Sequence, residues 1–213
     1  MSAGCCEDMA FDGNSARYKR ALLSVIAINA IMFVVEISAS IFSGSQALQA
    51  DALDFLADSV TYTITILVVG KSLKARATAA LFKGSSLALM GLGVLGSTLY
   101  HLFNGDTPTA EVMGLTAGLA LAANLASVFI LIRFRDGDSN VRSVWICSRN
   151  DALGNVAVLI AAWAVWETDS PLPDLMVAAF MASLFLYGAV QIIRQAKAEI
   201  ASGTLNPETA HAH

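Results

Sequence analysis

The chain has 213 residues, of which 56% are hydrophobic and 14% charged, and its formal net charge is −4. Soluble domains carry about 25% charged residues, so this composition, with a mean hydropathy of +0.62, excludes an ordinary soluble protein and indicates an integral membrane protein. A nucleic-acid-binding protein is also excluded, because the basic residues form only short groups beside apolar segments.

The first 20 residues are predicted to be a polar cytoplasmic tail that ends in basic residues. The apolar segment that follows is too long for the apolar part of a signal peptide, so we expect no cleaved leader. Cys5 and Cys6 are adjacent and Cys147 is distant, which is not the pattern of a disulfide framework. Cys5 and Cys6 either belong to a disordered tail or capture a soft metal ion near the cytoplasmic access to a site.

Six apolar segments follow the tail, each near the roughly 20 residues that cross the hydrocarbon core of a bilayer. The loop after the second segment is expected to extend to about Lys83, and Asp174 is a candidate cap of the sixth helix. The fold class is therefore all-α, a polytopic membrane protein. We predict six transmembrane helices over residues 21–42, 47–69, 81–103, 110–132, 144–165 and 174–193, which form one domain (residues 21–193) between tails over residues 1–20 and 194–213.

The basic residues predict the orientation. All 13 Lys and Arg lie in the first tail, in the loops after the second and fourth segments, near the start of the fifth segment, or after the sixth. The other three loops contain none. The positive-inside rule then places both termini in the cytoplasm, in a multi-pass protein of the cytoplasmic (inner) membrane.

Small residues in the third and fourth segments predict close helix packing. Gly91, Gly93 and Gly96 lie in the third segment, and a ladder of small residues runs over residues 114–122 in the fourth. Their packing partner is either the same bundle or a second subunit, so a homodimer through transmembrane helices is possible.

Three carboxylates interrupt the second segment, at Asp51, Asp54 and Asp58. Each charged residue costs about 2.5–3.5 kcal/mol at the centre of a membrane helix on insertion scales. At about 100° per residue, their spacing places all three on one stripe of a helix. A stripe of acids that faces the inside of a membrane bundle predicts a cation site.

The fifth segment supplies a second pair of candidate ligands. Cys147 and Asp151 are four residues apart and share a helix face. Together with Asp54 and Asp58 they offer three oxygens and one sulfur, a set that suits tetrahedral Zn²⁺ or Cd²⁺ better than Mg²⁺ or Ca²⁺. We therefore predict metal ligands at Asp54, Asp58, Cys147 and Asp151.

Other polar residues of these segments have weaker assignments. Asp51 either supports the ligands or caps the second helix, and Asn150 and Asn155 would support the ligands or line the access to them. Glu36 and Asn29 in the first segment are expected to serve in packing or gating. The competing interpretation of the acids is a hydrogen-bond network that packs the helices, and a lone cysteine is otherwise a small apolar residue.

The pattern resembles the cation diffusion facilitator family of metal/proton antiporters. Residues 43–52 (SGSQALQADA) are similar to that family's approach to its second helix, and Asp54 and Asp58 match its acid-or-histidine, three residues, acid pattern. Residues 151–155 (DALGN) resemble its fifth-helix signature, and residues 173–174 (PD) resemble the start of its sixth helix. The resemblance extends over most of the chain.

The resemblance implies a secondary transporter, neither an enzyme nor a protein with a prosthetic group. It would export a divalent metal ion, Zn²⁺ and also Cd²⁺, in exchange for protons, because ligands must be deprotonated to bind metal. The alternatives are a preference for Mn²⁺, Fe²⁺ or Co²⁺, or a membrane metal-binding or regulatory protein that does not transport. An intramembrane hydrolase is disfavoured, because the GxSxG and HExxH motifs do not occur in the sequence.

The sequence departs from the family pattern in three respects. The family commonly has a histidine where Cys147 stands, which bears on metal preference. Residues 194–213 are too short for the family's ferredoxin-like cytoplasmic domain, so we expect a dimer to rely on the membrane helices. Residues 70–84 contain no Asp, Glu, His or Cys, so the family's occasional extra site in that loop is not expected.

Overall fold

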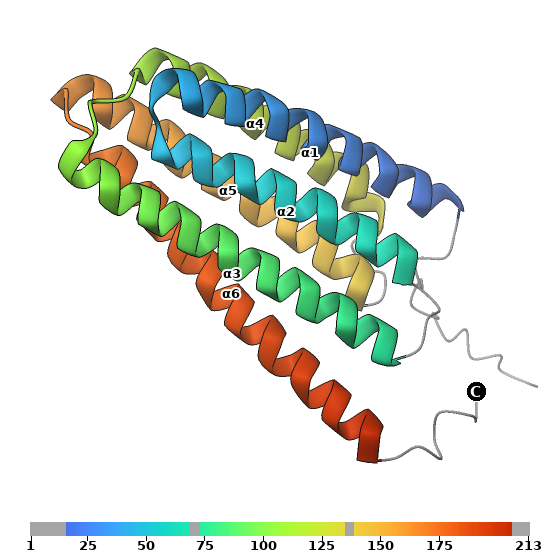
Figure 1. Cartoon of the computed structure of the whole chain (residues 1–213). Coiled ribbons are helices and arrows are strands. Elements are labelled where there is room, and N and C mark those ends of the chain that lie inside the picture. The colour runs from blue at the N-terminus through green and yellow to red at the C-terminus, as the bar shows by residue number, and fades with distance from the viewer. Residues whose placement is uncertain (1–15, 69–72, 135–138, 206–213) are drawn as a thin grey trace, which may run out of the picture.

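The computed structural model describes residues 16–68, 73–134 and 139–205, and this part of the chain is helical without strands. The fold class is therefore confirmed as all-α. Helices that follow one another in the chain run antiparallel (Figure 1). The helices are α1 (Ala16–Ser43), α2 (Gln46–Val68), α3 (Leu73–Asn104), α4 (Ala110–Leu131), α5 (Ser139–Thr168) and α6 (Leu172–Leu205), with a short 3-10 turn, η1 (Ile132–Phe134), after α4.

The six helices form two groups. Helices α3 and α6 pack on each other, while α1, α2, α4 and α5 pack as a bundle in which α1 contacts α2 and α4, and α4 contacts α5. Helix α2 also contacts α3 and α6, so it joins the two groups. Helix α6 diverges from the bundle toward its C-terminal end (Figure 1).

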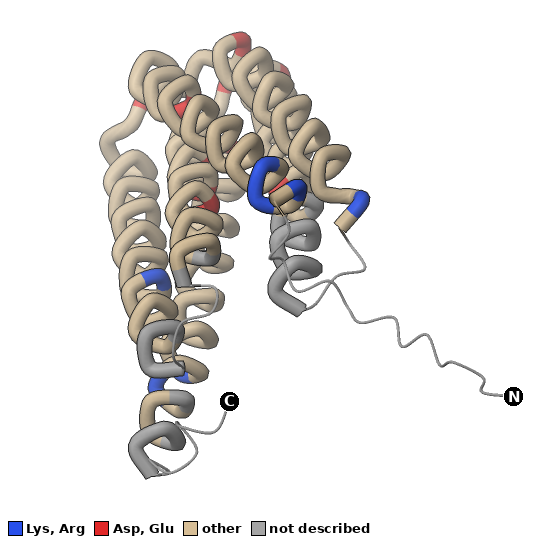
Figure 2. The backbone as a smooth tube through the Cα atoms, turned by 90° about the vertical axis from the view of Figure 1, so that its right-hand side faces the viewer, with Lys and Arg blue, Asp and Glu red and all other residues tan. Residues whose placement is uncertain are grey.

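The two ends of the molecule differ in charge. Lysines and arginines lie toward the end where α1 begins and α6 ends, which we call the basic end (Figure 2). Acidic residues lie in the interior and at the opposite end, where the turns before α2, α4 and α6 are found. This distribution agrees with the alternation of basic loops in the sequence, from which the positive-inside rule predicts that the basic end is cytoplasmic.

Several helices extend beyond their predicted ends. Helix α3 begins at Leu73, so the predicted loop to Lys83 was wrong in that part. Helix α6 continues to Leu205, so the first part of the predicted tail over residues 194–213 is helical. Alanine, lysine, arginine and glutamine dominate both extensions, and these residues have high helix propensity. Hydropathy detects only the apolar part of a helix, so it misses a polar extension.

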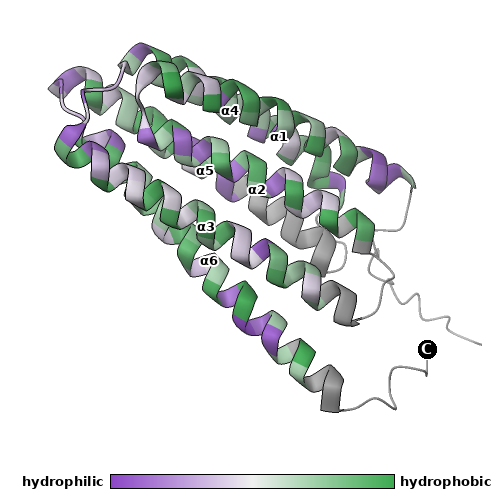
Figure 3. Ribbon diagram, viewed as in Figure 1, coloured by the Kyte–Doolittle hydropathy of each residue, from purple (hydrophilic) through white to green (hydrophobic). Residues whose placement is uncertain are grey.

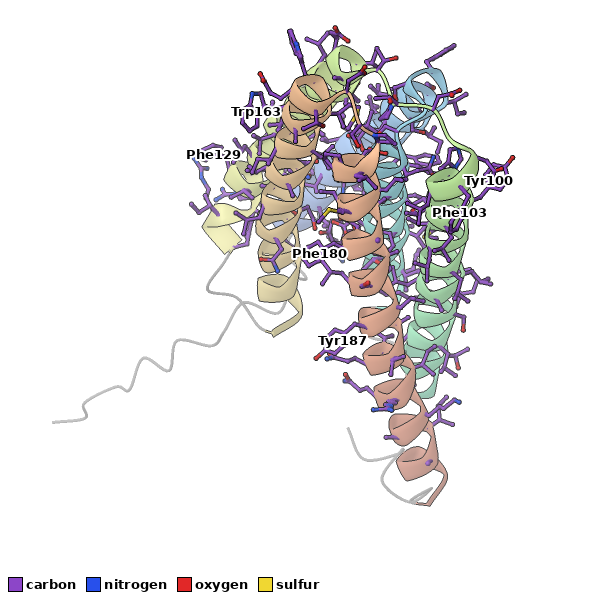
Figure 4. All side chains as sticks on the ribbon, turned by 90° about the vertical axis from the view of Figure 1, so that its left-hand side faces the viewer. Tyr100, Phe103, Phe129, Trp163, Phe180 and Tyr187 are labelled. Atoms are coloured by element: carbon purple, nitrogen blue, oxygen red, sulfur yellow. The ribbon has the colours of Figure 1, made fainter. Side chains whose placement is uncertain are left out.

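Hydrophobic residues occur along all of the helices, with hydrophilic ones between them (Figure 3). Aromatic side chains point away from the bundle (Figure 4), with Phe103 82%, Phe129 68% and Trp163 65% exposed. Monomeric soluble proteins rarely expose apolar surface on this scale. In the part of the chain described, four helices are long and apolar enough to cross a membrane, namely α1, α3, α4 and α6, so the chain is an integral, multi-pass membrane protein.

The glycines of α3 do not all serve packing. A Cβ atom added at Gly91 would lie 3.0 Å from Leu186 Cγ of α6, so close helix approach is confirmed there. At Gly93, Gly96 and Gly118, an added Cβ would meet none of the described atoms within 4 Å. These three glycines therefore have no packing partner among the described residues, and a second subunit as their partner stays a prediction.

Helix α2 begins with a cap that α6 supplies. The carboxylate of Asp174 accepts hydrogen bonds from Ser45 Oγ at 2.6 Å, Gln46 N at 2.8 Å and Ala47 N at 3.1 Å. Ser45 Oγ in turn accepts a bond from Leu48 N at 3.0 Å. An acidic group suits this position, because the first amides of a helix lack partners and carry a positive partial charge. Asp174 was predicted to cap its own helix, and instead it caps α2.

Candidate metal site

The acidic residues of α2 meet α4 and α5 in the interior of the bundle. Asp54 and Asp58 line a narrow pocket together with Phe55, Asn124 of α4 and Asp151 of α5. The i, i+4 spacing on α2 turns both aspartates toward the same neighbours. Three of the four predicted ligands are therefore brought to one place.

The carboxylates of this pocket contact one another. Asp151 lies within hydrogen-bonding reach of both Asp54 and Asp58. Tyr62, one turn farther along α2, donates a hydrogen bond from its hydroxyl to Asp58 Oδ2. Lys83 of α3 lies within electrostatic range of both α2 aspartates. Such a concentration of negative charge inside a membrane bundle favours a bound cation.

The complete ligand set is not tested by this geometry. Helix α5 includes Cys147, but its side chain lies outside the described residues, as do Cys5 and Cys6. Among the side chains that are described, no three from His, Cys, Asp and Glu meet the geometry of a metal site. The assignment of Asp54, Asp58, Cys147 and Asp151 as ligands therefore remains a prediction.

A second acidic pair lies between α1 and α2. Asp51 is 1% exposed and lies within α2, so it does not cap that helix. Its carboxyl group neighbours that of Glu36, which is fully buried in α1. Both oxygens of Glu36 and Oδ2 of Asp51 have no hydrogen-bond partner of standard geometry in the described part of the chain. This pair lies one helical turn from Asp54, toward the opposite end.

Buried amides extend the polar interior. Asn155 lies one turn beyond Asp151 on α5 and is fully buried, and neither atom of its amide has a partner among the described residues. Asn29 of α1 is also buried, and its Oδ1 has no hydrogen-bond partner among the described residues. Asn150, by contrast, is exposed. Unpaired polar groups are costly at membrane depth, so these amides mark a polar interior that packing alone does not require.

Sequence reasoning missed three residues of the site. Asn124 lines the pocket, and a signal for it existed, because an amide interrupts the apolar sequence of α4. Tyr62 follows Asp58 by four residues, a spacing that allows side-chain contact on a helix. Lys83 carried no usable signal, because it was assigned to the end of a loop.

Buried apolar residues pack beyond the pocket toward the opposite end, and a crevice lies between α2 and α3. The buried apolar residues on that side of the pocket include Ala47, Leu48, Ala50 and Val158. A largely apolar crevice of about 120 Å³ lies between α2 and α3, and its lining residues include Leu56, Val60, Thr61, Phe82 and Lys83. Asp54, Asp58 and Asp151 are only partly buried, so the pocket is not sealed on all sides.

Comparison with known proteins gives a family match over most of the chain. The family model for the cation efflux transmembrane domain matches residues 22–201. The chain is 26% identical over 205 residues to zinc transporter ZitB of Yersinia pestis, across 90% of this chain and 64% of that protein. It is 24% identical over 204 residues to zinc transporter ZitB of Escherichia coli K12, across 86% of this chain and 63% of that protein.

The chain therefore spans just under two thirds of the length of these relatives. The family match and the apolar helices together identify an integral, multi-pass protein of the cell membrane. The matched segment includes all or part of each of the six helices.

Proposed function

We propose that this chain, which belongs to the cation efflux family by its match over residues 22–201, moves a divalent transition-metal ion out of the cell. One observation carries the proposal. Asp54, Asp58 and Asp151 come from two different helices and meet at one pocket inside a membrane bundle. The names of the relatives, both zinc transporters, favour Zn²⁺ as the ion.

The proposed ligands are Asp54, Asp58, Cys147 and Asp151. Two helices that each give two donors can surround one ion, and three oxygens with one sulfur suit a tetrahedral Zn²⁺ or Cd²⁺. Asn124 and Tyr62 would orient the carboxylates, as hydrogen-bonded neighbours of metal ligands commonly do.

Proton exchange follows from the chemistry of this site. Carboxylates and a thiol must lose their protons before they bind a metal ion, so metal binding releases protons. In the proposed cycle, metal binds from the cytoplasmic side at the basic end, the site then opens to the opposite side, and protons replace the metal there. All six helices cross the membrane in this proposal, and the two groups of helices rock about the site near the midplane.

Removal of one ligand from each helix tests the proposal. We expect Asp54→Ala and Asp151→Ala, purified and reconstituted in liposomes, to lose zinc flux to the level of empty liposomes, because the remaining donors cannot complete the site. Glu111→Ala is the matched control, since Glu111 is an exposed acid at the opposite end, and its flux should equal that of the parent protein. Parent-like zinc flux in either aspartate variant would exclude this site.

The same measurement separates the alternatives. If the parent protein binds zinc but carries no flux, it is a membrane metal-binding or regulatory protein. If it transports Mn²⁺, Fe²⁺ or Co²⁺ in preference to Zn²⁺, the three carboxylate ligands determine the metal preference of the site and the thiol does not.

A further inference from the structure

The beginning of α2 is tied to both helices of the α3/α6 pair. Asp174 of α6 accepts the three hydrogen bonds from residues 45–47 described above. On the other side, the side-chain oxygen of Gln46 accepts a hydrogen bond from Ser97 Oγ of α3 at 2.6 Å. We call these residues the Asp174 clasp, which consists of Ser45, Gln46, Ala47, Ser97 and Asp174.

The clasp is buried and specific. Asp174 is 1% exposed, Ser45 is fully buried and Gln46 is 5% exposed. A buried carboxylate with three donors forms strong, directional bonds, and separation of its partners would leave all of these groups unsatisfied. Such a contact is either made or broken, so it has two discrete states.

The same helices are separated toward the basic end. There α6 diverges from the bundle (Figure 1), and a largely apolar crevice lies between α2 and α3 near the middle of both helices. Polar bonds thus join the two groups of helices at the opposite end, while a crevice lies between them farther along α2 and α3. The buried apolar residues between the pocket and the opposite end, among them Ala47, Leu48 and Ala50, directly follow the clasped start of α2.

We propose that Asp174 is a positioning residue that holds α2 against α3 and α6 at the opposite end and keeps the pocket closed there, and that the clasp must break for the pocket to open to that side. The inference rests on the proposed function, in which the site opens alternately to the two sides. Asp174 acts through the position of α2 and does not contact the metal.

Thiol labelling tests the clasp without any transport measurement. In a parent protein whose three native cysteines are replaced by serine, Ala50→Cys reports access from the opposite end, and Thr61→Cys reports access through the crevice. With an impermeant maleimide on the opposite side, we expect Asp174→Ala to raise the labelling rate of Ala50→Cys by about tenfold or more, the factor expected from lost hydrogen bonds to a buried charged group. Labelling of Thr61→Cys from the basic side should not increase.

Two further variants make this test specific. Glu111→Ala also removes an acid at the opposite end and should leave the labelling of Ala50→Cys unchanged. Asp174→Asn retains an oxygen that accepts a hydrogen bond, so its labelling rate should fall between those of the parent and Asp174→Ala. In the protein with native cysteines, Asp174→Ala should keep the zinc dissociation constant within about threefold and lower the maximal flux by about tenfold or more, as expected when a conformational step and not binding is affected.

Unchanged labelling of Ala50→Cys in folded Asp174→Ala would overturn the inference. If Asp174→Ala is not recovered from membranes, Ser45→Ala and Ser97→Ala, which each remove one hydroxyl of the clasp, provide the same comparison. If Asp174→Ala leaves the labelling of Ala50→Cys unchanged while the parent protein shows normal zinc flux, only the inference about the clasp is refuted. A clasp effect in a protein without zinc flux supports the clasp and refutes the proposed function.

Discussion

Tyr62 fixes the orientation of one carboxylate in the acidic pocket, through the hydrogen bond from its hydroxyl to Asp58. We expect Tyr62→Phe to weaken zinc binding by about tenfold, at the lower end of the 10–100-fold range for groups that hydrogen-bond to metal ligands. Zinc affinity of the purified protein in detergent, measured by competition with a chelator, checks this. Tyr187→Phe is the control, because Tyr187 is 66% exposed on the outer surface; equal affinities in both variants would exclude a role for Tyr62.

The sulfur of Cys147 is the predicted basis of metal preference. We expect Cys147→Asp, which makes the donor set all oxygen, to lower the Cd²⁺-to-Mn²⁺ ratio of transport by about tenfold or more, because thiolates favour soft ions. Cys147→His should retain Zn²⁺ transport, since imidazole is a good zinc ligand. A metal panel in liposomes measures the ratio, and Cys5→Ser controls for the N-terminal thiols. An unchanged ratio in Cys147→Asp would show that the thiol is not a ligand.

At the scale of residues, the sequence predicted the acids but not their surroundings. The helical spacing of Asp54 and Asp58 is a local property, so it was visible without a structure. Asn124 joins them only through tertiary packing of α4. Asp174 shows the same limit more clearly, because its partner Gln46 is 128 positions away in the sequence, whereas a local interpretation assigns the cap to the nearest helix.

The contact between α3 and α6 depends on small residues at defined positions. We expect Gly91→Ala to destabilise the protein by about 1–3 kcal/mol, the usual cost of an overpacked site, because its Cβ would lie 3.0 Å from Leu186 Cγ and 3.1 Å from Phe185 Cβ. Thermal unfolding in detergent measures the change. Gly93→Ala is the matched control two residues away, where an added Cβ meets no described atom within 4 Å.

Gly93→Ala should be neutral or slightly stabilising, because alanine has the higher helix propensity. If both variants unfold at the temperature of the parent protein, α3 and α6 do not pack as closely as the structure indicates. If Gly93→Ala is the more destabilised variant, Gly93 packs against another molecule, such as a second subunit.

Some of the helix boundaries could be predicted from the sequence, and others could not. The apolar segments located every helix, and the predicted and observed bounds of α2 and α4 differ by no more than one residue at each end. Helices α3 and α6 extend beyond their apolar segments, because alanine-, lysine- and glutamine-rich sequences remain helical outside hydrocarbon. Hydropathy alone could not show these extensions.

The whole molecule places its most polar helices among apolar ones. By length and composition, the helices suited to cross a membrane are α1, α3, α4 and α6 within the described chain, whereas α2 and α5 carry the aspartates. Helix α2 contacts each of the other five helices, and α5 packs on α2, α4 and α6. Charged groups at membrane depth are tolerated where they face a bundle interior, and this arrangement supplies such an interior.

The central claim, exchange of a divalent metal ion for protons at the acidic pocket, is tested most directly in liposomes that contain the purified protein and a pH-sensitive dye. A zinc gradient should drive zinc across the membrane and protons in the opposite direction, and Asp54→Ala should abolish both fluxes together. Zinc flux without any opposing proton flux, or a proton flux that persists in Asp54→Ala, would contradict the account.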